Sequence, residues 1–365
     1  MNFLKELAWN KRHMTRTANV VSQLPNCTDK KLAVSTHLDI KMVAFYEGFL
    51  KQGGQLFITT CNPTTVRDEV VEYLVSLGAE AKAWKNMSDA DWQASLHSAL
   101  EWQPTHLCEF GAQLGTLSHN STEPNNIIAS LEGTGSGVSA LSKMSLKHPV
   151  FNWDDLDAKE GLHNRHMVGL SAWQAFMERT HLSLHEKKVV VVGYGLVGQG
   201  CAASAKSFGG QVIIAENDPS RSLLAAYDGW HTAPLKDVIA QADVVVTATG
   251  VAGVLNNNML SQLKTGAFVM NVGHVSHEIM LDTMTNYQIE EVMPEIYEYR
   301  QGDHYFYALS NGAMFNLTAG YGDSLNAFDV SLALMASGVK HMFEKSDQFE
   351  NGMHMLPEQA WKPFL

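Results

Sequence analysis

Short apolar runs alternate with amphipathic segments through the first third of the chain. The apolar runs have the composition of buried strands, and the segments between them place apolar residues at helical spacing. Strands are predicted at residues 30–37, 55–61, 79–84 and 105–110, and helices at 41–53, 64–78 and 89–102. Strands and helices that alternate in this way build a parallel sheet covered on both faces.

A second alternating series follows a Gly/Ser-rich stretch at residues 131–141. A helical segment at 171–182 precedes predicted strands at 187–193, 211–218, 242–250 and 267–274, and a last helical run covers 325–343. We therefore predict an α/β protein with two doubly wound parallel-sheet domains. We expect residues 1–168 with 324–365 to form one of these domains and residues 169–323 to form the other.

Composition and charge exclude several classes of protein. The 365 residues, 45% of them hydrophobic, can bury more than one core. Acidic residues outnumber basic ones by 38 to 26, for a net charge of -12, so we expect no nucleic-acid partner. No signal peptide is recognisable, and no apolar run approaches the roughly 20 residues of a membrane span, which predicts a soluble, cytoplasmic protein.

The cysteines give no sign of a metal or disulfide framework. Cys27, Cys61, Cys108 and Cys201 lie far apart, without a CxxC pair. We expect reduced, mostly buried thiols and no metal site.

The stretch VVVVGYGLVGQG at residues 189–200 has the glycine spacing of a dinucleotide-binding turn. Gly193, Gly195 and Gly198 follow a predicted strand and open a predicted helix, where backbone N–H groups can approach a pyrophosphate. The next strand ends in Glu216, near the expected spacing of the carboxylate that bonds the adenosine ribose. Because Glu216 would repel a 2′-phosphate, NAD is favoured over NADP. The alternative is a plain strand-to-helix turn with a surface glutamate.

Further motifs follow in a fixed order. The second domain contains GYGLVGQGCA, IIAENDP, VVTATG, NVGHVSHEI and NGAMFNL, and the first contains STHL, TTCN, EGTGSGV and AKEGLHN. Together they resemble the S-adenosylhomocysteine hydrolase (adenosylhomocysteinase) family from about residue 30 to residue 357. The resemblance implies that residues 1–168 with 324–365 are the substrate-binding and catalytic domain and that residues 169–323 are a Rossmann NAD-binding domain. It also implies a homodimer or homotetramer that acts on a small nucleoside in one-carbon metabolism.

The reaction implied by this resemblance uses NAD as a retained catalyst. Bound NAD oxidises the ribose 3′-hydroxyl, the neighbouring C4′ proton becomes acidic, and homocysteine leaves from C5′. Water then adds, and the ketone is reduced back. The cofactor carries the hydride chemistry, while the protein supplies placement and proton transfers.

The resemblance also assigns roles to individual residues. Lys159 matches the lysine beside the 3′-hydroxyl, where desolvation can lower its pKa enough for it to accept a proton. Asn164 would position that lysine and face the nicotinamide. His37 and His274 match histidines near C5′, and either imidazole could move a proton near neutral pH. Glu132 matches a carboxylate that holds the ribose hydroxyls.

The remaining matches concern the cofactor and the substrate pocket. Cys61 corresponds to a position near the substrate, although a buried structural thiol explains it equally well. Expected cofactor contacts besides the three glycines are Leu196 and Val197 within the glycine motif and, outside it, Thr134, Ser136, Thr249, Gly273, His274 and Asn316.

Several departures cluster where the family contacts its substrate. Phe110 stands in place of a proton-transferring acid, directly after the retained Glu109. His163 replaces an aspartate before Asn164, and Asp39 replaces a threonine near the substrate. Loss of one general acid or base costs about two to four powers of ten in rate, so the reaction needs a substitute such as Glu109, His163 or His37. The chain is also expected to lack the family's C-terminal tail.

These departures leave three hypotheses open. The first is an NAD-containing hydrolase or lyase that cleaves S-adenosylhomocysteine or a related 5′-thioether. The second is a nucleoside dehydratase or 3′-dehydrogenase that uses the same bound NAD. The third is a catalytically silent NAD-binding paralogue that regulates a partner.

Overall fold

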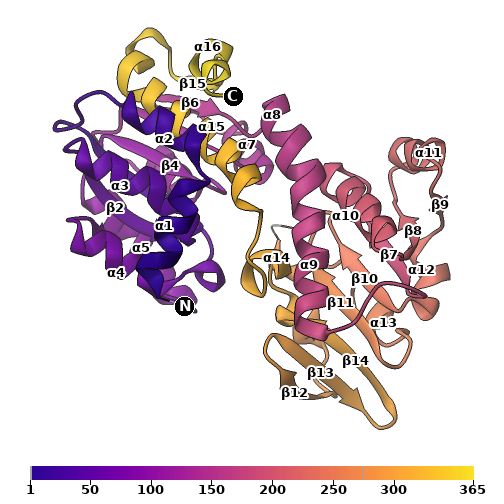
Figure 1. The fold of residues 1–365 in the computed structure, drawn as a ribbon. Helices are drawn as coiled ribbons and strands as arrows, with labels where there is room; N and C mark the ends of the chain where they lie inside the picture. The colour runs from indigo at the N-terminus through magenta and orange to yellow at the C-terminus, as the bar shows by residue number, and fades with distance from the viewer. Residues whose placement is uncertain (1, 274) are drawn as a thin grey trace. The chain divides into compact units, whose positions relative to one another are not determined.

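The computed structural model describes residues 2–273 and 275–365. The chain divides into two compact units, which we call unit 1 (residues 1–160 and 325–365) and unit 2 (residues 161–324). Each unit is an α/β structure built on a largely parallel sheet, so the predicted fold class is confirmed. Figure 1 shows the course of the chain through both units. No helix in the described ranges is long and apolar enough to cross a membrane.

Unit 1 contains a seven-stranded sheet in which every neighbouring pair is parallel. Its order is β15-β6-β5-β4-β1-β2-β3. The strands are β1 (Lys31–Thr36), β2 (Gln55–Thr60), β3 (Glu80–Ala81), β4 (His106–Glu109), β5 (Ala129–Glu132), β6 (Pro149–Asn152) and β15 (Gly352–Met355). Strands β4, β5 and β6 are buried along their whole length, as expected for a sheet covered on both faces.

The helices of unit 1 come from both ends of the chain. They are α1 (Phe3–Arg12), α2 (Thr15–Ser22), α3 (Val43–Lys51), α4 (Asp68–Ser76), α5 (Asp89–Glu101), α6 (Gln113–Asn120), α7 (Gly135–Leu141), α8 (Asp157–Lys159), α15 (Leu325–Lys345) and α16 (Glu358–Trp361). Helix α15 packs on α2 and β5. Its buried Asp329 accepts hydrogen bonds from the Thr17 backbone N–H at 2.8 Å and from the Thr17 hydroxyl at 2.8 Å. The chain end is thereby fixed to the chain start.

Unit 2 contains an eight-stranded sheet of order β12-β13-β14-β11-β10-β7-β8-β9. The strands are β7 (Lys188–Val192), β8 (Gln211–Ala215), β9 (His231–Thr232), β10 (Val244–Thr247), β11 (Ala267–Asn271), β12 (Gln288–Met293), β13 (Ile296–Gln301) and β14 (His304–Leu309). Strands β14 to β9 run parallel, whereas β13 is antiparallel to both of its neighbours. The sequence analysis did not predict this antiparallel extension.

Unit 2 also contains α9 (Val168–Thr180), α10 (Leu196–Ser207), α11 (Pro219–Tyr227), α12 (Leu235–Val238), α13 (Asn257–Leu260) and α14 (Phe315–Thr318). Helices α9 and α10 pack against each other, as Figure 1 shows. A Cβ on Gly169 would lie 2.4 Å from the Cys201 backbone nitrogen, so this glycine permits the close approach. A π-helix at Glu160–Met167 precedes α9.

Candidate functional site

The glycine turn between β7 and α10 forms an open cradle in unit 2. Gly193 has a φ of +95°, a backbone conformation in which a residue with a side chain would be strained. A Cβ on Gly198 would lie 2.0 Å from the Gly193 carbonyl oxygen, so the helix start and the turn touch directly. The Cβ position of Gly195, in contrast, has no atom within 4 Å. The turn is therefore closed on its protein side and open at Gly195.

The first turn of α10 is suited to an anion. Gly195 is the N-cap residue and supplies no side-chain acceptor for the first N–H groups of the helix. Leu196 and Val197, the first two helical residues, are half-buried at this end. The unpaired N–H groups and the helix dipole together favour a phosphate there.

Glu216 lies directly after β8, beside the cradle. Its carboxylate accepts hydrogen bonds from the Tyr194 backbone N–H at 2.7 Å and from the Asp218 backbone N–H at 2.8 Å. Tyr194 belongs to the glycine turn, so Glu216 holds that turn while it remains half-buried. The role of Glu216 as a ribose-binding carboxylate stays a prediction.

Buried polar side chains fix the loops that follow β10 and β11. Glu278 is fully buried and accepts from the Thr249 hydroxyl at 2.7 Å and the Gly250 N–H at 2.7 Å. Asn271 accepts from the Gly273 N–H at 2.8 Å. The sequence analysis predicted Thr249 and Gly273 as cofactor contacts but missed Glu278, which positions the first of them. The predicted His274 lies outside the described residues.

Asn316 supplies a test of whether a nicotinamide fits. It is 2% exposed, its Nδ2 lies 3.5 Å from the Ser171 hydroxyl, and its Oδ1 has no partner among the described residues. A buried acceptor without a donor costs about 1–3 kcal/mol. A ligand carboxamide would supply that donor. With the open cradle at Gly195, this unsatisfied oxygen fits a bound NAD.

Within unit 1, an aromatic row runs across the strand ends and consists of His37, Phe110 and Trp153. These residues follow β1, β4 and β6. The ring centroids of His37 and Phe110 are 5.7 Å apart, and those of Phe110 and Trp153 are 6.0 Å apart. The Nε1 atom of Trp153 is buried and has no partner among the described residues. The row therefore combines apolar faces with one unsatisfied donor.

Lys159 stands at the Trp153 end of the aromatic row. Its ammonium nitrogen is 5.9 Å from the centroid of the Trp153 ring. The same nitrogen is ion-paired with Oδ1 of Asp154. Both residues are buried, at 7% and 3% exposure. The sequence analysis predicted the lysine but not its carboxylate partner.

His37 stands at the other end of the row. Its Nδ1 is 2.8 Å from the Thr65 hydroxyl and 3.5 Å from the Cys61 sulfur. Burial raises the pKa of the Cys61 thiol well above its usual value, which favours the neutral thiol. Asp39 lies nearby in the chain and is ion-paired with the buried Lys41 at 2.7 Å.

Glu109 and Glu132 are fully buried neighbours on β4 and β5. Glu109 accepts from the backbone N–H groups of Leu114 and Gly115, at 2.8 and 2.7 Å. Glu132 accepts from those of Gly111 and Ala112, both at 2.9 Å. Burial, followed by the charge of Glu132, raises the pKa of Glu109 to about 8, and burial raises that of Glu132 to about 7. In this structure the two carboxylates hold the loop that carries Phe110.

The threonine and serine of the Gly-rich stretch lie at the start of α7. The Thr134 hydroxyl donates to Glu132 at 2.7 Å and accepts from the Gly137 N–H at 3.1 Å, so it caps the helix. The Ser136 hydroxyl is exposed and lies 3.3 Å from that of Thr134. Because the Thr134 hydroxyl is engaged in capping the helix, the exposed Ser136 hydroxyl is the more accessible of the two to a ligand.

His163 and Asn164 lie in the π-helix, on the unit 2 side of the division. Nδ1 of His163 contacts Oδ2 of Asp323, whose Oδ1 is buried without a partner in the described ranges. Asp323 is 3% exposed and was not predicted. His163 therefore compensates a buried carboxylate in its own unit, while Asn164 is half-buried.

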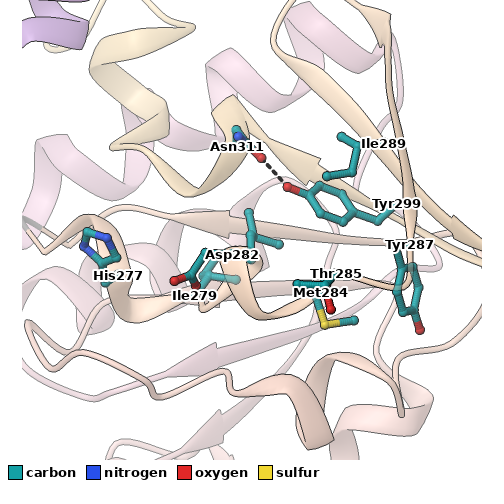
Figure 2. A pocket seen from close by; sticks show the side chains of 10 residues that line it. His277, Ile279, Asp282, Met284, Thr285, Tyr287, Ile289, Tyr299 and Asn311 are labelled. Atoms are coloured by element: carbon teal, nitrogen blue, oxygen red, sulfur yellow. Dashed lines mark hydrogen bonds between the residues drawn. The ribbon is translucent and has the colours of Figure 1, made fainter. Parts of the chain in front are cut away.

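A separate cavity of about 490 Å³ lies in unit 2 beside β13. Figure 2 shows its lining, where the Tyr299 hydroxyl donates to Asn311 at 2.6 Å. The lining residues are His277, Ile279, Leu281, Asp282, Met284, Thr285, Tyr287, Ile289, Tyr299 and Asn311. None of them was predicted to bind substrate or cofactor.

Comparison with known proteins identifies similar chains over both units. Residues 166–322 match the family model described as S-adenosyl-L-homocysteine hydrolase, NAD binding domain. The S-inosyl-L-homocysteine hydrolase of Methanococcus maripaludis is 31% identical, over 98% of this chain and 89% of that protein. The adenosylhomocysteinase of Thermotoga maritima is 30% identical, over 97% of this chain and 91% of that protein. The likeness thus extends well beyond the cofactor unit.

Proposed function

Because this chain belongs to the S-adenosyl-L-homocysteine hydrolase family, we propose that it hydrolyses the 5′-thioether of S-adenosyl-L-homocysteine or of a closely related nucleoside. Its cofactor is NAD. The observation that carries the proposal is the buried Lys159 at the end of the aromatic row, in a chain that also contains the glycine cradle. Lysine is one of the side chains that can act as a general acid or base when it is positioned beside the reacting group.

The residues of unit 2 would hold the cofactor. The start of α10 and the open face of Gly195 suit the pyrophosphate, and Glu216 suits the adenosine ribose. The unsatisfied Oδ1 of Asn316 suits the nicotinamide carboxamide. When bound, NAD supplies reversible redox chemistry at the sugar.

The residues of unit 1 would handle the sugar and its protons. Lys159 would exchange a proton with the 3′-hydroxyl, and the free indole N–H of Trp153 would donate to a sugar oxygen. His37, held by Thr65, would serve the leaving sulfur and the incoming water near C5′. Phe110 carries no proton, and its ring would exclude water from one side of the sugar.

The test is an assay of thiol release by the purified protein. S-adenosyl- and S-inosyl-L-homocysteine are both offered, because relatives of this chain carry both names. We expect free homocysteine, an equal amount of nucleoside, and NAD that is recovered unchanged from the denatured enzyme. Absence of thiol with both substrates, from a protein that contains NAD, would contradict the proposal.

The finer expectations about the protein's state belong to the same proposal. We expect a homo-oligomer in the cytoplasm. Light scattering of the purified protein and fractionation of the producing cells test these two points.

A further inference from the structure

The ion pair between Lys159 and Asp154 is held rigidly within unit 1. The Asp154 backbone N–H donates to Oδ1 of Asn152 at 2.9 Å, and the Lys159 backbone N–H donates to the Leu156 carbonyl at 2.8 Å. The side chain of Asp154 is 5% exposed and that of Lys159 is 9% exposed. Both ends of the pair are thus fixed by the backbone around β6 and α8.

This pairing creates a problem for a base. A lysine that is ion-paired carries its full set of protons and cannot accept another from a sugar hydroxyl. Its surplus proton must first move to an acceptor, and within the described residues the bonded acceptor is Oδ1 of Asp154. Such a transfer leaves an amine and a carboxylic acid, both neutral. Both residues are buried, and burial weakens the preference for charged forms that water provides.

We propose that Asp154 is a positioning residue that stores the surplus proton of Lys159 during the reaction. This inference rests on the proposed function. The ammonium of Lys159 gives one proton to Oδ1 of Asp154, and the resulting amine takes the proton of the 3′-hydroxyl as C3′ is oxidised to a ketone, for which the nicotinamide cofactor of the proposed function would accept the hydride. When C3′ is reduced again, Lys159 returns that proton to the sugar oxygen and Asp154 returns the stored proton to Lys159. No proton is gained or lost over the cycle.

The surroundings of the pair support the assignment of Lys159 as the base and Asp154 as the store of its proton. Trp153 lies 5.9 Å from the Lys159 ammonium, and the ring of Phe110 lies beside that of Trp153. The other carboxylates near the pair are those of Asp155 and Glu160, each with an oxygen within 4.8 Å of one of Asp154, whereas the bonded partner of Lys159 is Asp154. Asp155 is the nearest comparison residue, because it follows Asp154 in the chain, is exposed, and accepts from the Asn152 side chain at 2.7 Å. It supplies a matched control for the loss of one negative charge.

The test compares Asp154→Asn, Asp154→Glu and Asp155→Asn with the wild-type holoenzyme. For Asp154→Asn we expect kcat for thiol release to fall about a hundredfold at neutral pH, with KM little changed. The deficit should narrow as the pH rises, because the solvent then takes the surplus proton. Asp154→Glu should restore most of kcat, and Asp155→Asn should behave as wild type. A purely structural role would not produce this dependence on pH.

A second measurement is independent of turnover. Trace acetylation followed by peptide mass spectrometry reports how freely each lysine amine reacts. Lys159 should react several-fold faster in Asp154→Asn than in wild type, while the exposed Lys147 reacts equally in both.

The outcomes separate this inference from the proposed function. Equal kcat for Asp154→Asn and wild type would overturn the inference, as would a deficit that is the same at every pH. If Asp154→Asn fails to fold, a folded Asp154→Glu with low kcat and no change in Lys159 labelling would also overturn it. A wild-type enzyme that releases no thiol would refute the proposed function, whatever the labelling shows.

Discussion

The Gly195→Ala substitution separates cofactor binding from folding. Gly195 has φ and ψ of -71° and -176°, an extended conformation that alanine adopts without strain. Apart from its neighbours along the chain, its added methyl group would meet no atom of the described residues within 4 Å. The stability of the NAD-free protein should therefore stay constant or rise by about 0.4–1 kcal/mol, through the reduced entropy of the unfolded chain. The methyl group instead projects into the open face of the cradle.

There it would collide with a bound pyrophosphate. Overpacking of a close contact costs about 1–3 kcal/mol, so the Kd for NAD should rise roughly 5- to 150-fold. Gly198→Ala is the matched variant, because its Cβ would lie 2.0 Å from a backbone oxygen. That substitution should lower the stability of the NAD-free protein itself by about 1–3 kcal/mol.

The assay is thermal unfolding of both variants after removal of NAD, followed by titration with NAD. The expected pattern is a stable Gly195→Ala that binds weakly and a Gly198→Ala that unfolds early. Tight binding by Gly195→Ala would show that the phosphate does not lie against this face. A Gly195→Ala as unstable as Gly198→Ala would show that the face is not open.

Three further predictions concern unit 1 and the π-helix. Lys159→Ala should abolish thiol release and any reduction of bound NAD, yet keep the NAD content measured after denaturation; unchanged turnover would refute its role. Glu109 and Glu132 have folded pKa values of about 8 and about 7, raised by burial above the usual carboxyl value, so the folded state binds more protons than the unfolded state. Their contribution to stability is complete below about pH 4 and is lost as the pH rises through about 7 to 8. The melting temperature should therefore fall over that range, and it should fall by less in Glu109→Gln. Equal slopes of melting temperature against pH in wild type and Glu109→Gln would contradict this reasoning. His163→Ala removes the hydrogen-bond partner of the buried Oδ2 of Asp323 and should destabilise unit 2 by about 1–3 kcal/mol, measured by thermal unfolding, with His166→Ala as an exposed control.

The fold was largely predictable because parallel strands leave a strong signal. The valines at 189–192 are buried on both faces of β7. A continuous apolar run of this kind is typical of a strand inside a parallel sheet that is covered on both faces. Strand β12 gave no comparable signal, since all six of its residues are exposed and two are glutamates. The alternating tyrosines of β13 and the three consecutive aromatic residues of β14 did offer a clue. The antiparallel extension was missed because its edge strand, β12, has no buried residues and so leaves no apolar pattern in the sequence.

The candidate site was predictable only in part. Strand ends identified His37, Phe110 and Glu109, because the topology brings such positions to one edge of the sheet. The hydrogen-bond partners of the site residues depend on how the loops after the strands fold, which the spacing of residues along the sequence does not reveal. Glu109 accepts from backbone amides of its own loop, and Lys159 meets Asp154 only through the turn after β6. Such contacts arise from the folded backbone rather than from any motif.

The assembly of unit 1 from both chain ends has a consequence for biosynthesis. Helix α15 and strand β15 are translated after unit 2, and both are needed to complete the sheet and core of unit 1. Residues 161–324 are already translated by then, so the later-encoded unit can mature first while the earlier one waits for its closing helix. A nascent chain arrested near residue 324 should therefore expose an unfinished amino-terminal half to chaperones beside a completed nucleotide-binding half.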